Sequence, residues 1–85
     1  MEIELTAKAD IDLAYWQKTK NQKVLKRIRE LFASIIETPF SGIGKPEGLK
    51  YNLSGKWSRR IDQENRIIYE VLKDLIIIHS LKGHY

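Results

Sequence analysis

Residues 49–81 read LKYNLSGKWSRRIDQENRIIYEVLKDLIIIHSL, and the sequence period shifts towards two at residues 49–53 and 57–62. A period of two is typical of strands, because successive side chains of a strand point to opposite faces of its sheet. The pattern predicts strands at 49–53, 57–62, 66–72 and 75–81, separated by turns at 54–55, 63–65 and 73–74. We expect the last three strands to form an antiparallel meander.

Two further features bear on the predicted sheet. Residues 75–78 are apolar on both sides of their strand, as expected of a central strand or of one covered on both faces. Residues 2–5 alternate Ile3 and Leu5 with acids, so this segment is expected to add an edge strand.

The region before the sheet has a helical period. Apolar residues recur three or four positions apart between Val24 and Ile36, with charged residues between them. This amphipathic helix must end near Thr38, because Pro39 lacks an N–H and disfavours helical geometry in the residue before it. A shorter helix is expected to precede it, with Thr6 as the N-cap and an apolar side formed by Ile11, Leu13, Ala14, Tyr15 and Trp16.

These elements predict an α+β fold in which two N-terminal helices pack on one face of a mostly antiparallel sheet of four to five strands. The length of 85 residues predicts a single domain, residues 1–85. The sequence has no cysteine, which excludes disulfides and thiolate–zinc sites. It has no signal-peptide pattern and no run near the roughly 20 apolar residues of a membrane helix, so we expect a cytoplasmic protein without membrane association.

The charge distribution favours a polyanionic partner. The formal net charge is +4, and the segment 45–60 contains five basic residues and a single acid, Glu47. Such clusters bind phosphates, and Lys50, Arg59 and Arg60 are the candidates for RNA contacts. An ordinary solvated basic surface is the alternative explanation of the same charges.

Glu47 is a candidate general base. It lies in the segment PFSGIGKPEG, residues 39–48, which holds both prolines and three of the five glycines and is therefore predicted to be a loop. A free glutamate has a pKa of about 4.3 and accepts protons weakly, so catalysis would require its surroundings to adjust it. The alternative is a solvated surface carboxylate.

Arg60 and Arg66 flank one predicted turn. If that turn comprises residues 63–65, Asp62 pairs with Arg66, and both arginines lie on one face of the sheet. Two neighbouring guanidiniums suit a phosphate, although nearby acids could neutralise them instead. Lys50 joins them only if the turn at 54–55 has one extra residue.

His84 and Tyr85 end the sequence. A histidine with a pKa near 6.5 suits proton donation to a leaving alkoxide, provided that the last strand holds it in place; a frayed tail is the alternative. His79 is expected to occupy a packed or hydrogen-bonded position in the sheet. With two histidines and no cysteine, a metal site is not expected. Tyr51 and Trp57 could stack on bases, but core packing is the simpler expectation for both.

The run GKPEGLKYNLSGKWSRRIDQENRIIYEV and the terminal His84-Tyr85 resemble the YoeB/Txe toxins of the RelE-like superfamily. The resemblance covers nearly the whole chain, including YWQ in the first helix, and implies a RelE-like fold. It places the family's catalytic residues on Glu47, Arg66, His84 and Tyr85, and its supporting cations on Lys50 and Arg60. The chain departs from the family at Leu81-Lys82-Gly83, where relatives tend to carry an aromatic residue and an arginine.

The resemblance also implies a function: a metal-independent endoribonuclease that cuts mRNA in the ribosomal A site. In that mechanism Glu47 accepts the ribose 2′-OH proton, Arg66 stabilises the phosphate, His84 protonates the leaving 5′ oxygen and Tyr85 orients substrate or histidine. The products would be a 2′,3′-cyclic phosphate or 3′-phosphate and a 5′-hydroxyl.

The partners implied by the resemblance are ribosome-bound mRNA with ribosomal RNA, and a cognate YefM/Axe-like antitoxin. A homodimer is a further option, and operator DNA would be reached only through the antitoxin. No cofactor is implied. Two other functions fit the same composition: a non-catalytic module that binds RNA or an antitoxin, and a structural subunit of a larger assembly.

Overall fold

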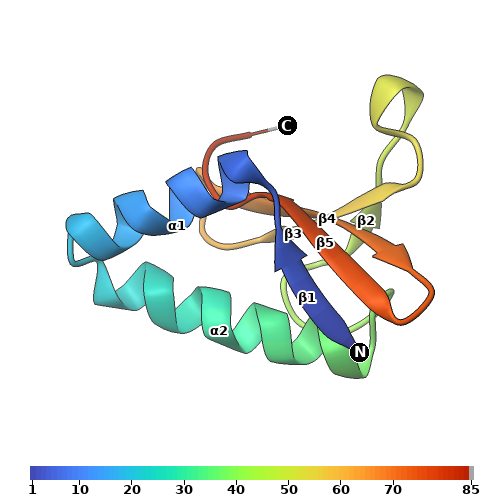
Figure 1. Cartoon of the computed structure of the whole chain (residues 1–85), viewed down its shortest axis with the longest axis horizontal. Helices are drawn as coiled ribbons and strands as arrows, with labels where there is room; N and C mark the ends of the chain where they lie inside the picture. The colour runs from blue at the N-terminus through green and yellow to red at the C-terminus, as the bar shows by residue number, and fades with distance from the viewer. Residues whose placement is uncertain (85) are drawn as a thin grey trace.

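The computed structural model describes residues 1–84 and has an α+β architecture. The order along the chain is β1 (Glu2–Leu5), α1 (Ala7–Lys18), α2 (Gln22–Glu37), β2 (Glu47–Gly48), a 3₁₀ turn (Tyr51–Leu53), β3 (Lys56–Arg60), β4 (Arg66–Leu72) and β5 (Leu75–Ser80). The five strands form one sheet in the order β1-β5-β4-β3-β2. Strand β1 runs parallel to β5, and the other neighbours are antiparallel, which confirms the predicted fold class and meander (Figure 1).

The two helices begin and end for local reasons. Thr6 caps α1, because its hydroxyl oxygen accepts the N–H of Ala9 at 3.2 Å. Asn21 caps α2 in the same way through Val24. Helix α2 ends at Glu37, immediately before Thr38 and Pro39, as predicted.

The apolar side predicted for α1 was partly wrong. Its buried residues are Ala9, Asp12 and Trp16, whereas Ile11 and Tyr15 are exposed. Helix α2 follows its pattern and buries Val24, Ile28, Leu31 and Ile35.

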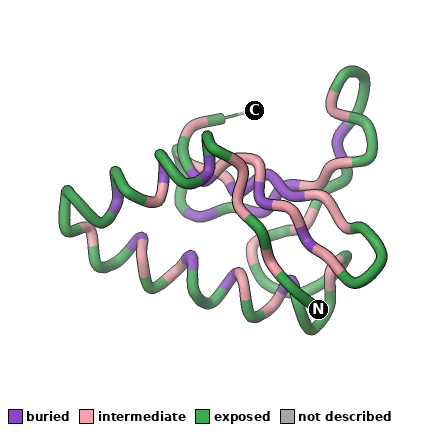
Figure 2. The backbone as a smooth tube through the Cα atoms, viewed as in Figure 1, coloured by how far each residue is buried: buried purple, intermediate pink, exposed green. Residues whose placement is uncertain are grey.

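The core lies between the helices and one face of the sheet. Buried residues of both helices pack there with apolar side chains of the strands, including Ile67 and Tyr69 of β4 and Ile76 and Ile78 of β5. Figure 2 shows the buried positions where the helices face each other and the sheet. The opposite face of β3 and β4 carries the exposed Arg60 and the half-buried Arg66, next to the buried Ser58 and Ile68.

The strand predicted at 49–53 is absent, and the structure places a two-residue strand, β2, just before it. Glu47 and Gly48 pair with β3, and the chain then leaves the sheet through the 3₁₀ turn. The alternation of Leu49, Tyr51 and Leu53 misled the prediction because only Leu49 is buried. Residues 50–55 instead protrude as an exposed loop (Figures 1 and 2).

Residues 1–84 contain two α-helices, α1 and α2. Neither α1 nor α2 combines the length and the apolar character needed to cross a membrane.

Candidate active site on the open face of the sheet

The strand register brings three predicted site residues to one face of the sheet. Arg60 on β3 lies directly opposite Arg66 on β4. Glu47 on β2 lies opposite Ser58, two residues before Arg60 and therefore on the same face. Glu47 and Arg60 are thus diagonal neighbours, about 7–8 Å apart, and Arg66 lies one strand further across the same face.

The turn before Arg66 is wider than predicted. Asp62 does not pair with Arg66; instead the backbone N–H groups of Ile61 and Asp62 both donate to the Asn65 carbonyl oxygen. The Asp62 carboxylate accepts from the N–H groups of Glu64 and Asn65 at 2.9 and 2.7 Å. Burial alone would raise the pKa of Asp62, but these hydrogen bonds lower it below its ordinary value.

Arg59, predicted to bind RNA phosphate, is completely buried, so that prediction was wrong. Its alternation with Trp57 and Ile61 places it on the core face, where a solvent phosphate has no access. The guanidinium is satisfied from within the chain. It donates to the carbonyl oxygens of Thr38 (2.6 Å), Ser41 (2.8 Å) and Ile43 (3.1 Å) and to the hydroxyls of Ser34 (2.7 Å) and Tyr69 (3.1 Å).

Arg59 therefore fixes the segment that leads to Glu47. Its carbonyl partners belong to the end of α2 and to the loop that follows, and the Tyr69 hydroxyl donates to the Pro39 carbonyl oxygen at 2.6 Å. Burial raises the pKa of Tyr69, and the neighbouring Arg59 charge offsets part of that rise. The phenol thus stays a hydrogen-bond donor at neutral pH.

Two glycines let this loop lie close to the core. Gly44 has φ +84°, and a Cβ there would approach Leu31 Cδ2 to 2.8 Å. A Cβ at Gly42, with φ +114°, would lie 2.6 Å from Ser34 Oγ. The Gly44 carbonyl oxygen accepts the Arg60 N–H at 2.7 Å, which joins the loop to β3 just before Glu47.

Residues 81–83 are held from two sides. On the helix side, the buried Asp12 carboxylate accepts the N–H of Leu81 at 2.9 Å, and Trp16 Nε1 donates to the Leu81 carbonyl oxygen at 2.9 Å. Lys8 completes this anchor with an ion pair to Asp12 at 2.6 Å. Leu81 itself is fully buried.

On the sheet side, Gly83 contacts the turn that precedes β4. Its N–H donates to Asn65 Oδ1 at 2.8 Å, and its carbonyl oxygen accepts the Arg66 N–H at 3.0 Å. Gly83 has φ +88°, so the tail bends here in a conformation that suits glycine. The exposed His84 thus follows a residue bonded directly to Arg66, whereas Tyr85 lies outside the described residues.

Asp12 and Asn65 had not been identified from the sequence. Their partners in the tail are 69 and 18 residues away, and no local pattern connects them. For Asn65 the turn preference was visible, but its contact with Gly83 was not.

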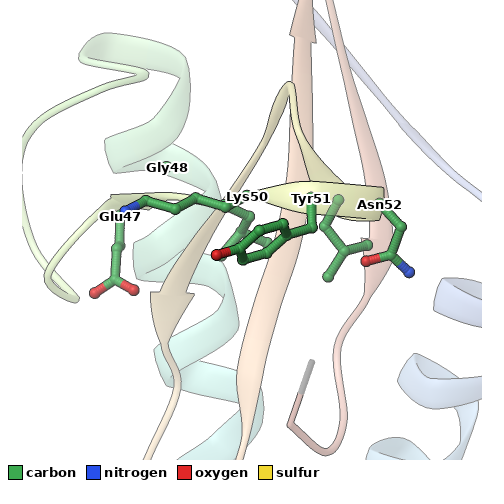
Figure 3. A pocket seen from close by; sticks show the side chains of 7 residues that line it. Glu47, Gly48, Lys50, Tyr51 and Asn52 are labelled. Atoms are coloured by element: carbon green, nitrogen blue, oxygen red, sulfur yellow. The ribbon is translucent and has the colours of Figure 1, made fainter.

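Lys50 lies beside Glu47 in a groove. This groove has a volume of about 480 Å³ and is lined by residues 47–53. Figure 3 shows the Lys50 side chain extending toward Glu47. Because Lys50 follows β2 rather than lying within a strand, the predicted pairing with Arg59 or Arg60 was wrong, although the groove still brings its ammonium near the carboxylate.

His79 occupies the hydrogen-bonded sheet position that was expected. Its Nε2 lies 2.9 Å from Glu70 Oε1 on the adjacent strand. Glu70 is therefore engaged with His79, and Asp62 is engaged within its own turn.

Comparison with known proteins identifies the family of the chain. Residues 5–85 match the family model for the YoeB-like toxin of bacterial type II toxin-antitoxin systems. The chain is 49% identical over 74 residues to "Toxin YoeB" of Escherichia coli strain K12, covering 87% of each chain.

Solved structures give the same result. A YoeB/ParE toxin from Agrobacterium tumefaciens superposes with a TM-score of 0.96 at 34% identity, covering 100% of both chains. A YoeB-YefM complex from Staphylococcus aureus gives a TM-score of 0.90 at 45% identity, covering 98% of this chain and 95% of that chain. A YoeB dimer from the same species gives a TM-score of 0.91 at 43% identity, covering 100% and 98%. The chain described here therefore belongs to the family of YoeB-like toxins of bacterial type II toxin-antitoxin systems.

Proposed function

We propose that this toxin is an endoribonuclease that cleaves messenger RNA in the ribosomal A site and so inhibits translation. The observation that carries the proposal is the meeting of four elements at one place. Strands β2, β3 and β4 bring Glu47, Arg60 and Arg66 to one face, and the Gly83–Arg66 hydrogen bond brings His84 to its border. A base, paired cations and an acid are the groups that RNA cleavage by transesterification requires.

The reaction begins with the ribose 2′-OH, a group that DNA lacks. Glu47 accepts its proton as the 2′ oxygen attacks the adjacent phosphorus in line with the leaving 5′ oxygen. Arg66, with Arg60 and Lys50, stabilises the charge on the phosphate oxygens, and His84 donates a proton to the leaving oxygen. Tyr85 orients the substrate or the histidine. The products are a 2′,3′-cyclic phosphate, or a 3′-phosphate after hydrolysis, and a 5′-hydroxyl.

The donor groups of this site support a metal-independent reaction. One carboxylate, Glu47, stands among cationic side chains, whereas divalent metals bind to groups of carboxylates, imidazoles or thiolates. Cleavage should therefore persist when ribosomes and toxin are mixed in the lowest magnesium that keeps ribosomes intact, and it should not respond to added zinc or manganese.

The partners follow from charge and from the relatives. The net charge of +4 favours both RNA and an acidic antitoxin of the YefM/Axe type, part of which folds on the toxin surface. The Staphylococcus aureus relatives form a YoeB-YefM complex and a YoeB dimer, and we propose both associations for this cytoplasmic toxin. Operator DNA would then be bound through the antitoxin.

The decisive experiment is to induce the toxin alone in bacteria and map the 5′ ends of ribosome-bound mRNA. New 5′-hydroxyl ends at A-site codons are expected for the wild type and should disappear for Glu47→Gln, Arg66→Ala and His84→Ala. Glu64→Gln, in the turn before β4, is the matched control and should cleave normally. Intact messages during growth arrest, or equal arrest by wild type and all three variants, would favour a non-catalytic binding module instead.

A further inference from the structure

Tyr51 has a backbone conformation and an exposure that are unusual for an aromatic residue. Its φ is +59°, in the left-handed region that residues with a side chain rarely adopt, and 92% of its surface is exposed. Such a residue contributes little to the stability of the fold, because its ring is not buried and its backbone is strained.

The surrounding loop holds this conformation in place. The Leu53 N–H donates to the Lys50 carbonyl oxygen at 3.1 Å, and the Ser54 N–H donates to the Tyr51 carbonyl oxygen at 3.0 Å. The Leu49 N–H closes the loop by donating to the Lys56 carbonyl oxygen at 2.9 Å. These bonds hold the backbone of the loop, and the Tyr51 ring is exposed, contrary to the packing expected from the sequence.

Trp57, the other aromatic residue considered for base stacking, shows the contrast. It packs against the core, and its ring lies 4.9 Å from that of Phe40. The core-packing prediction is therefore confirmed for Trp57 and wrong for Tyr51.

Tyr51 also lies in the same groove as the proposed general base. The groove of about 480 Å³ is lined by Glu47, Lys50 and Tyr51 together with their neighbours. Figure 3 shows the side chains of Lys50 and Tyr51 both extending back toward Glu47, whereas Asn52 points away. An aromatic face, a cation and a carboxylate thus come from one short segment.

We propose that Tyr51 stacks on a nucleobase of single-stranded RNA beside the phosphate that is cleaved. The Glu47 carboxylate disfavours a further phosphate in the groove, whereas a neutral, flat base fits the phenol ring and leaves Lys50 to the phosphate that is cleaved. Stacking is available to every base and needs no hydrogen-bond pattern. This inference rests on the proposed function, since it places the ring at the substrate of that reaction.

The test measures binding separately from cleavage. Full-length toxin is titrated into a labelled single-stranded RNA with 2′-O-methyl riboses, which lacks the attacking hydroxyl, and affinity is read by fluorescence anisotropy. Tyr51→Phe and Tyr51→Trp should keep the affinity, while Tyr51→Leu should weaken it about tenfold or more, because base–aromatic stacking is lost. Tyr15→Leu, which removes an exposed tyrosine from α1, should bind like the wild type.

Tyr51→Gly separates binding from folding. Glycine adopts the left-handed conformation without strain, so this variant should unfold at the same urea concentration as the wild type or a higher one, yet bind RNA as weakly as Tyr51→Leu. Equal RNA affinity for wild type, Tyr51→Leu and Tyr51→Gly would overturn the inference. So would a loss confined to antitoxin binding, which would assign the ring to a protein interface.

Failure of the proposed function gives a different result. Glu47→Gln should abolish mRNA cleavage without removing the dependence of binding on an aromatic ring at position 51. If the wild type does not cleave but Tyr51→Leu still weakens RNA binding, the proposed catalysis is wrong and the stacking site stands.

Discussion

The backbone N–H of Arg66 donates to the carbonyl oxygen of Gly83 across 3.0 Å, so that β4 holds the residue preceding His84. The Asn65 side chain accepts the Gly83 N–H at 2.8 Å and completes the contact. Chain ends normally fray, and these two bonds oppose fraying next to the proposed catalytic histidine.

Asn65→Ala should therefore reduce the rate of mRNA cleavage. The alanine removes the acceptor for Gly83, and because general acid catalysis contributes about 100-fold or more, partial misplacement of His84 should cost about tenfold in kcat. The measurement is cleavage on programmed ribosomes under saturating conditions. Gln63→Ala, in the same turn, is the control, and equal rates for the two variants would show that Asn65 does not position the tail.

Asp12→Ala should destabilise the fold. It leaves the N–H of the buried Leu81 without its carboxylate acceptor, and an unsatisfied buried donor costs about 1–3 kcal/mol. Urea denaturation should show a lower midpoint with an unchanged slope. Glu30→Ala, on the exposed side of α2, should stay within about 0.5 kcal/mol of the wild type. Equal midpoints for both variants would contradict the anchoring role of Asp12.

Replacement by lysine should affect stability at Arg59 and cleavage at Arg60. Arg59→Lys cannot satisfy the five acceptors of the buried guanidinium and should lose about 2–4 kcal/mol of unfolding free energy. Arg60 is exposed, so Arg60→Lys should change the free energy of unfolding by less than about 0.5 kcal/mol. It should slow cleavage, because lysine contacts the phosphate more weakly than arginine does. Urea denaturation and ribosome cleavage assays on both variants check the pair. A stable Arg59→Lys variant would mean that the loop does not depend on that guanidinium.

Gly44→Ala and Gly55→Ala separate steric contact from backbone strain. Both glycines have positive φ, so the backbone strain of each alanine alone should cost about 1–2 kcal/mol of unfolding free energy. A Cβ at Gly55 meets nothing within 4 Å, whereas one at Gly44 would approach Leu31 and Arg59. We therefore expect Gly44→Ala to cost about 1–3 kcal/mol more than Gly55→Ala in urea denaturation. Equal losses would show that the loop moves freely away from the core.

Much of the fold could be predicted because its signals are local. Thr6 and Pro39 mark helix boundaries through their own chemistry, and the strands 66–72 and 75–80 are mainly apolar, rich in β-branched residues and separated by a turn. The parallel pairing of β1 with β5 had no such signal, since its partners lie more than 70 residues apart. The segment of the 3₁₀ turn was predicted as a strand because an exposed loop can also alternate apolar and polar residues.

The placement of the candidate site residues was predictable only in part. Arg60 and Arg66 were expected on one face, and they lie opposite each other. The turn that joins their strands is wider than the predicted turn at 63–65. Arg59 was assigned to RNA by charge, while its alternation with Trp57 and Ile61 already placed it on the core face. A buried arginine needs several acceptors, and those came from a loop whose path no local pattern describes.

Strand β5 is the last strand to be synthesised, yet it lies between β1, the first, and β4. During synthesis, β1 therefore cannot join β2, β3 and β4 in one sheet until residues 75–80 are available, and Gly83 can reach Arg66 only after that. Long-range pairing of this kind forms late in folding. Any change that slows the docking of β5 should therefore also delay the assembly of the proposed active site, because the segment that carries Gly83 follows β5 directly.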